Sequence, residues 1–170
     1  MRTQLSSILV DSPSLIIYYL AINENQIGQT TWEERAKLFV LKASKLLNDL
    51  KAWLTVEAEL LFLSYDSAQG ADEQVHYPDI IFGVLDCVAN TALLVIDKIL
   101  RSLCLSRLQA SSGPGRSFQK QLQLQAKQLL EDPEIIERRR QRVKRAFEFV
   151  KEESEYAAKP LDFGLRVFTQ

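Results

Sequence analysis

The sequence has few helix-breaking residues and few residues of the kinds that build reactive or metal-binding sites. It holds 6 glycines and 5 prolines in 170 residues, which argues against a turn-rich β architecture. His76 is its one histidine, so the sequence offers neither a histidine-based triad nor a site with several histidine ligands. Cys87 and Cys104 fall in one predicted helix about 25 Å apart, which excludes a disulfide between them. We therefore expect no metal, no cofactor and no enzyme activity.

An excess of charge of one sign is also absent. The sequence carries 21 Lys and Arg against 22 Asp and Glu, so no overall field draws it to phosphate or to an anionic membrane. Apolar residues make up 46% and charged residues 25%, as in an ordinary globular domain. No secretion signal is recognised at the start, and two buried thiols suit a reducing compartment. The expected location is the cytoplasm or the nucleus.

Helix-forming residues are abundant and follow helical periodicity. The pattern predicts helices near residues 12–23, 32–64, 78–106, 118–130 and 133–156, and a short closing segment near 160–168. Thr31 with Glu34 fits a capping box, while Asp132 and Pro133 form a helix start. The Ser, Gly and Pro residues of 107–117 predict a flexible internal linker. We predict one all-α domain over residues 1–170, a single bundle of about five helices.

Segment 78–106 is the most apolar of these helices and is predicted to lie at the centre of the bundle. Its polar residues fall within an arc of about 60°, and they are Asp79, Asp86, Asn90, Asp97 and Arg101. A membrane span is the alternative by length, but three carboxylates and an asparagine would be costly in hydrocarbon. Asp86 and Asp97 lie about 16 Å apart along the helix, too far to share a proton. We expect a buried helix with a polar stripe and no membrane span.

The run "ERRRQRVKR" at 137–145 has six cationic side chains in nine positions. From Glu131 to Tyr156, however, seven cations face eight anions, and Glu134 with Arg138 and Lys144 with Glu148 are spaced to pair. The buried stripe of this helix is predicted to consist of Ile136, Val143, Phe147 and Val150. Three arginines are predicted to lie on the opposite face, namely Arg138, Arg142 and Arg145. We favour a solvated, salt-bridged helix face. The alternatives are a nuclear-import signal or nucleic-acid contact through Arg138, Arg139, Arg140 and Arg142.

The first predicted helix, "SLIIYYLAI", is apolar around nearly its whole circumference. A helix at the edge of a bundle normally keeps one face in water, so this composition indicates a contact with another chain. Ile16, Tyr19 and Leu20 are the candidate residues, for a protein partner or for self-association. The alternative is that the long helices of the same bundle wrap this helix completely.

Two segments of the sequence carry a family resemblance, namely "YPDIIFGVLDCVANTALLVIDKILRSL" and, after a linker, "ERRRQRVKRAFEFVKEESEYAAKPLDFGLRVF". Together they resemble the C-terminal part of the helical regulatory region in fungal zinc-cluster transcription factors. The resemblance covers roughly residues 32 to 168. It implies a non-catalytic regulatory or protein-interaction domain located in the nucleus. The six-cysteine zinc cluster that contacts DNA in that family has no counterpart here, so the resemblance does not extend to DNA binding. The alternatives are a nucleic-acid-binding protein that uses helix 137–145, or an enzyme of unrecognised type.

Overall fold

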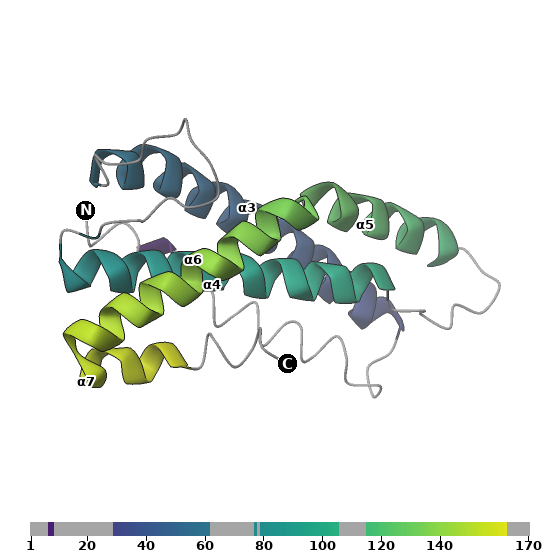
Figure 1. Cartoon of the computed structure of the whole chain (residues 1–170). Coiled ribbons are helices and arrows are strands. Elements are labelled where there is room, and N and C mark those ends of the chain that lie inside the picture. The colour runs from purple at the N-terminus through teal and green to yellow at the C-terminus, as the bar shows by residue number, and fades with distance from the viewer. Residues whose placement is uncertain (1–6, 9–28, 62–76, 78, 106–114, 163–170) are drawn as a thin grey trace.

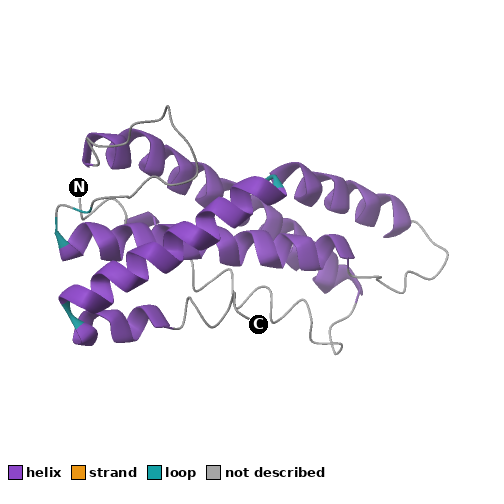
Figure 2. Cartoon of the chain, viewed as in Figure 1, coloured by secondary structure: helices purple, strands orange, loops and turns teal. Residues whose placement is uncertain are grey.

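The computed structural model describes residues 7–8, 29–61, 77, 79–105 and 115–162, and this part of the chain is helical with no strand (Figures 1 and 2). Its elements are α3 (Gln29–Leu61), α4 (Ile80–Leu105), α5 (Gly115–Leu129), α6 (Pro133–Glu153), the short α7 (Glu155–Ala158) and the 3-10 turn η1 (Lys159–Leu161). The predicted all-α class is confirmed. The predicted helix 12–23, His76 and most of the predicted linker lie outside the described residues.

Helix α4 is the centre of the described structure. It packs against α3, α5 and α6, and α6 crosses it obliquely (Figure 1). Leu93 and Leu100 are completely buried, and Ile81 and Val88 are half-buried. The central placement predicted for segment 78–106 is therefore confirmed. By length and composition Ile80–Ser102 could also cross a membrane, and half of its most apolar window is buried inside the protein.

Two apolar clusters lie on different sides of α4. The first joins α3, α4 and α5 and includes Phe39, Leu50, Leu93, Leu100 and Leu122. The second joins α4 to the C-terminal elements and includes Cys87, Leu94, Val143, Val150 and Leu161. Helix α4 contributes to both clusters and therefore lies between α3 with α5 and the C-terminal elements.

The starts of α6 and α4 have side-chain caps. The Asp132 carboxylate accepts the backbone N–H of Glu134 at 3.0 Å, and Pro133 occupies the first turn of α6, as predicted. Asp79 likewise accepts the N–H groups of Ile81 at 2.7 Å and Phe82 at 3.2 Å at the start of α4. Two starts come earlier than predicted, because α3 begins at Gln29 and α5 at Gly115. Thr31 therefore lies inside α3, and the prediction that Thr31 and Glu34 cap its start was wrong.

The predicted helix 133–156 is not continuous, because Ser154 interrupts it. Ser154 has an extended backbone, with φ of −160° and ψ of 109°, although its N–H still reaches the carbonyl of Val150 at 2.8 Å. Its hydroxyl accepts the N–H of Ala157 at 3.3 Å and so starts α7. The break turns the chain so that Ala158 and Leu161 are buried in the second cluster. Periodicity alone did not indicate it, since residues on both sides are helical.

Candidate functional site

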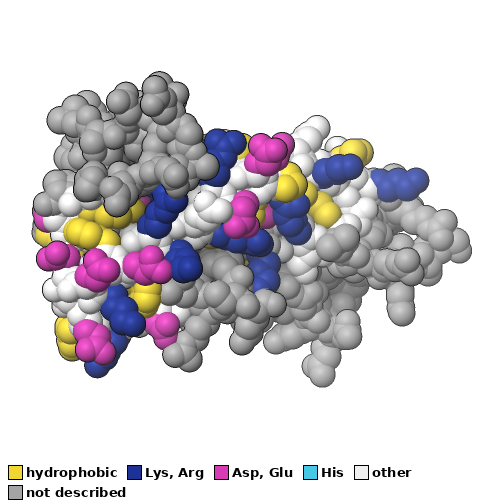
Figure 3. Space-filling view, viewed as in Figure 1, with side chains coloured by type: hydrophobic (Ala, Val, Ile, Leu, Met, Phe, Trp, Pro, Cys, Tyr) yellow, Lys and Arg dark blue, Asp and Glu magenta, His cyan; other side chains and the backbone are white. Residues whose placement is uncertain are grey.

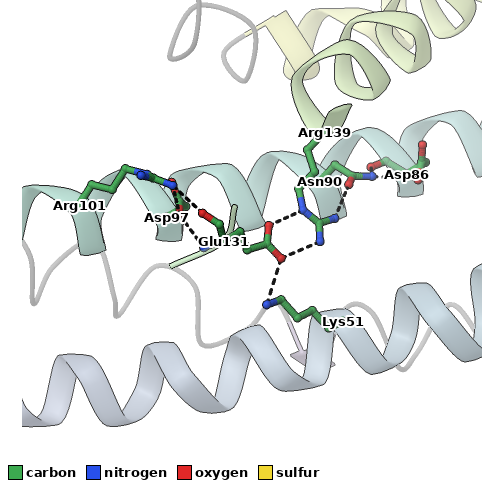
Figure 4. Close-up of polar contacts among 7 residues, drawn as sticks. All are labelled: Lys51, Asp86, Asn90, Asp97, Arg101, Glu131 and Arg139. Atoms are coloured by element: carbon green, nitrogen blue, oxygen red, sulfur yellow. Dashed lines mark hydrogen bonds and ion pairs between the residues drawn. The ribbon is translucent and has the colours of Figure 1, made fainter. Parts of the chain in front are cut away.

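Three residues of the polar stripe of α4 are buried, namely Asp86, Asn90 and Asp97, whereas Asp79 at its start is exposed. Asp86 is fully buried, and Asn90 and Asp97 are exposed by 1% and 5%. Figure 4 shows Asn90 meeting Arg139 of α6 and Asp97 meeting the segment before α6, whereas Lys51 of α3 meets Glu131. Buried polar groups are costly without hydrogen bonds, and buried charges without counter-ions. Each of these three side chains therefore requires hydrogen-bond or ion-pair partners from neighbouring elements.

Asp86 is held by three donors. Its Oδ2 accepts the Tyr77 hydroxyl at 2.8 Å and the Arg142 Nε at 2.7 Å, and its Oδ1 accepts the Asn90 side-chain amide at 3.0 Å. The side chain of Arg142 is only 18% exposed. Charge-assisted hydrogen bonds of this kind offset the loss of water around a buried carboxylate. The Asp86 carboxylate is thereby fixed in position between α4 and α6.

Asn90 continues this network toward α3. Its Oδ1 accepts the Arg139 Nη1 at 3.0 Å, and Arg139 also donates Nε and Nη2 to the two oxygens of Glu131, at 2.7 and 2.9 Å. The Glu131 carboxylate, 6% exposed, also pairs with the Lys51 Nζ at 3.0 Å. A planar guanidinium facing both oxygens of a carboxylate fixes orientation as well as distance. Helices α3, α4 and α6 are thus joined by one continuous polar chain.

Asp97 and Arg101 hold the segment between α5 and α6. Arg101 pairs with Asp97 one turn away and donates Nη2 to the backbone carbonyl of Glu131 at 2.8 Å. The backbone N–H of Glu131 donates to the Asp97 Oδ1 at 3.3 Å. Both backbone groups of Glu131 are therefore satisfied by α4. This arrangement presents its side chain to Arg139 and Lys51.

The electrostatics of this interface change two titratable groups. Burial opposes ionisation of Glu131, but hydrogen bonds and charges from Arg139 and then Lys51 outweigh it and hold the pKa of this carboxyl below its usual value of 4.5. Burial, followed by the charge of Asp86, raises the pKa of the Tyr77 hydroxyl far above its usual value. The interface therefore combines an ionised carboxylate with a protonated phenol. Both favour the arrangement of donors and acceptors described above.

The structure divides the predicted basic run into two groups. Arg138 and Arg140 are exposed, with 76% and 51% of their side chains in solvent, whereas Arg139 and Arg142 lie in the α4–α6 interface at 17% and 18%. The placement of Arg142 opposite the buried stripe was wrong. Ala146, which is completely buried, lies only about 40° from Arg142 around the helix, and it widens the buried face on that side.

Two predicted ion pairs on the outer face of α6 are present. Glu134 meets Arg138 at 3.9 Å, and Lys144 meets Glu148 at 4.0 Å. The nuclear-import and nucleic-acid alternatives for Arg138, Arg139, Arg140 and Arg142 stay predictions. The candidate interface of Ile16, Tyr19 and Leu20 lies outside the described residues.

Sequence reasoning missed Tyr77, Lys51 and Glu131 as members of the network. One signal was available, since Asp86 and Asn90 on an otherwise apolar helix require donors from other elements. Which donors supply them depends on how α6 and α3 cross α4, which no local pattern encodes.

Within the described ranges, no group of three or more His, Cys, Asp or Glu side chains is arranged to hold a metal ion. Comparison of the chain with models of protein families, with curated proteins and with solved structures finds no match.

Proposed function

We propose that the chain is a non-catalytic regulatory or protein-interaction domain. The observation that carries the proposal is the neutralisation of the buried polar interface by its own residues. Each buried carboxylate forms an ion pair with an arginine of this chain: Asp86 with Arg142, Asp97 with Arg101, and Glu131 with Arg139. Groups engaged in this way are poor candidates for binding or activating a substrate. They position α6 on α4 instead.

Buried ion pairs suit this role physically. The desolvation cost of two charges cancels much of their attraction, so such pairs add little net stability, and their best-attested use is to fix one arrangement over others. The buried pairs between α4 and α6 favour the one orientation in which each carboxylate meets its cation. A domain that presents a surface to a partner requires the helices that form that surface to keep one orientation. The network therefore fits a binding domain.

The finer proposal follows the resemblance to the regulatory region of fungal zinc-cluster transcription factors. On this proposal the chain acts in the nucleus and alters transcription through contacts with other proteins. It lacks that family's six-cysteine DNA-binding motif, so it depends on another chain or segment to reach DNA. The basic helix is the rival route to nucleic acid, because Arg138 and Arg140 are exposed, although Glu134 and Glu137 pair with them.

A tethering experiment tests the regulatory proposal. Fused to a DNA-binding domain that has no effect of its own, the chain should change transcription of a reporter carrying the matching site. Leu93→Asp, which places a charge in the first cluster, is the unfolded control. A folded fusion that occupies the site and leaves transcription unchanged would contradict the proposal. Steeply salt-dependent DNA binding by the purified chain, lost in R138Q/R140Q, would favour the rival.

A further inference from the structure

The C-terminal end of the described chain folds back onto the second cluster. After the extended Ser154, α7 lies against α6 and η1 reaches α4 (Figure 1). Ala158 and Leu161 are exposed by only 3% and 8% and belong to the second cluster, and the half-buried Ala157 packs against it. We name residues 155–161 the strap.

Little of the strap is buried. Four of its residues are exposed, namely Glu155, Tyr156, Lys159 and Pro160. Figure 3 shows charged side chains of both signs at the end of the molecule where α6 meets α7. Helix α7 is four residues long and η1 three, and helices of that length are not stable without packing. The strap therefore depends on its contact with the second cluster for its conformation.

The hydrogen bonds at the start of the strap are local. The Ser154 hydroxyl accepts the N–H of Ala157 at 3.3 Å, and the Ser154 carbonyl accepts the N–H of Ala158 at 3.1 Å. Pro160 has no backbone N–H to donate. Elements with few buried apolar contacts open before the rest of a domain unfolds. The strap is an element of this kind, because its attachment consists of a few small or aliphatic side chains.

We infer that the strap is an autoinhibitory segment, which covers a surface of the second cluster that a partner protein binds once the strap opens. The strap itself shows what this surface accepts, a short helical segment that presents Ala158 and, three residues later, Leu161. The partner is therefore an amphipathic helix with a small residue and a leucine at this spacing and polar residues on its other side. The inference rests on the proposed interaction function and adds its regulation.

Competition between the strap and the partner gives the direction of the expected effects. A segment of the same chain competes at an effective concentration on the order of millimolar, so closure of the strap weakens the binding of a separate molecule. The apparent affinity for the partner is reduced to the fraction of chains whose surface is open. A substitution that releases the strap without unfolding the domain should therefore strengthen partner binding.

Hydrogen exchange of the unmodified full chain tests whether the strap opens by itself. The amides of Ala157 and Ala158 should exchange faster than those of Val143 and Val150 in α6, and their rates should not change with urea below the unfolding transition. The α6 amides should exchange faster as urea is added, because they require global unfolding. Strap amides that exchange only together with the α6 amides would overturn the inference.

Leu161→Asp tests the covered surface, because it places a charge at a buried position of the strap. Leu124→Asp is the matched control, since Leu124 is 61% exposed on α5. A synthetic peptide of residues 154–162 is the probe, and NMR titration up to about 10 mM measures its binding. The peptide should bind the Leu161→Asp chain about ten-fold or more tightly than it binds the unmodified chain or Leu124→Asp. The same peptide carrying Leu161→Asp should not bind.

Two further results would contradict the inference. If circular dichroism shows that Leu161→Asp unfolds the chain, the strap is part of the core and cannot open alone. If the folded Leu161→Asp chain does not bind the peptide, the strap covers no binding surface.

The reporter experiment separates this inference from the regulatory proposal. The Leu161→Asp fusion should change transcription more than the unmodified fusion or the Leu124→Asp fusion does. Equal changes in all three would contradict the inhibitory role of the strap. No change with any of the three would contradict the regulatory proposal instead, and the exchange and peptide measurements would still test the strap.

Discussion

Arg142 donates its Nε to the Oδ2 of Asp86 at 2.7 Å, across 56 residues of sequence, and the Asp86 side chain has no exposed surface. This contact joins the helix that looked most polar in the sequence to the one that looked most apolar. Two arginines of the basic run, Arg139 and Arg142, therefore pair with buried carboxylates of the same chain.

Removing Arg142 should be costly. Arg142→Ala leaves a buried carboxylate with only Tyr77 and Asn90 as donors, and we expect it to lower the free energy of unfolding by about 3 to 5 kcal/mol, the usual cost of breaking a buried pair. Arg138→Ala, in the exposed pair with Glu134, should cost no more than about 1 kcal/mol. Urea denaturation of both variants checks the difference. Equal costs would mean that the Asp86 contact does not hold α6.

The double variant D86L/R142L separates net stability from orientation. Replacing both members of a buried pair by apolar side chains removes the desolvation cost along with the attraction, so it should destabilise less than Arg142→Ala alone. Tyr77 then loses an acceptor, which limits the recovery. Unfolding curves give the comparison. A double variant less stable than Arg142→Ala would indicate that the pair itself contributes most of the α4–α6 contact energy.

Stability should depend on pH through Glu131. Its pKa is lower in the folded chain than the usual 4.5, so its contribution is complete above about pH 4.5 and is lost as the pH falls through the folded-state value. Glu131→Gln should therefore be less stable at neutral pH and should lose less stability between pH 5 and pH 3. The loss of stability between pH 5 and pH 3 in Lys51→Met should lie between that of the unmodified chain and that of Glu131→Gln, because Arg139 still pairs with Glu131. Parallel acid unfolding curves for all three proteins would contradict this account.

Helix α6 packs closely against Gly83 of α4. A methyl group there would stand 2.8 Å from the Phe149 Cδ1 and 3.0 Å from the Val150 Cγ2. Gly83→Ala gains about 1 kcal/mol of helix propensity but overpacks the second cluster at a cost of about 1 to 3 kcal/mol, so we expect a lower melting temperature. The substitution should cost less in a Phe149→Ala background. A higher melting temperature in Gly83→Ala would show that α4 and α6 can move apart to admit the methyl group without a loss of stability.

The two thiols should differ in reactivity. Cys87 is 1% exposed, and burial raises its pKa to about 11, whereas Cys104 is partly exposed with a pKa that burial raises less far. The thiolate is the reactive form, so alkylation at pH 8 should modify Cys104 first and Cys87 only as the chain unfolds. Mass spectrometry of pulse-labelled protein measures both rates, with Cys104→Ser to isolate the signal of Cys87. Rapid labelling of Cys87 in the folded chain would contradict its burial.

The sequence by itself determined the elements that depend on neighbours along the chain. Helical periodicity located α3, α4, α5 and α6, Asp132 and Pro133 marked the start of α6, and the apolar circumference of segment 78–106 placed it at the centre. These features follow from contacts within a few residues, which local patterns record directly.

Tertiary structure alone decided the meaning of the polar residues. One network joins Asp86 and Asn90 of α4 to Arg139 and Arg142 of α6, because α6 crosses α4 beside these residues. Lys51 joins the network because α3 passes on the other side of Glu131 (Figure 4). A long arginine side chain at the edge of a helix face can turn to solvent or to a buried carboxylate with the same sequence around it. The choice depends on whether a neighbouring helix offers a desolvated carboxylate within reach, and only the packing of the helices supplies that.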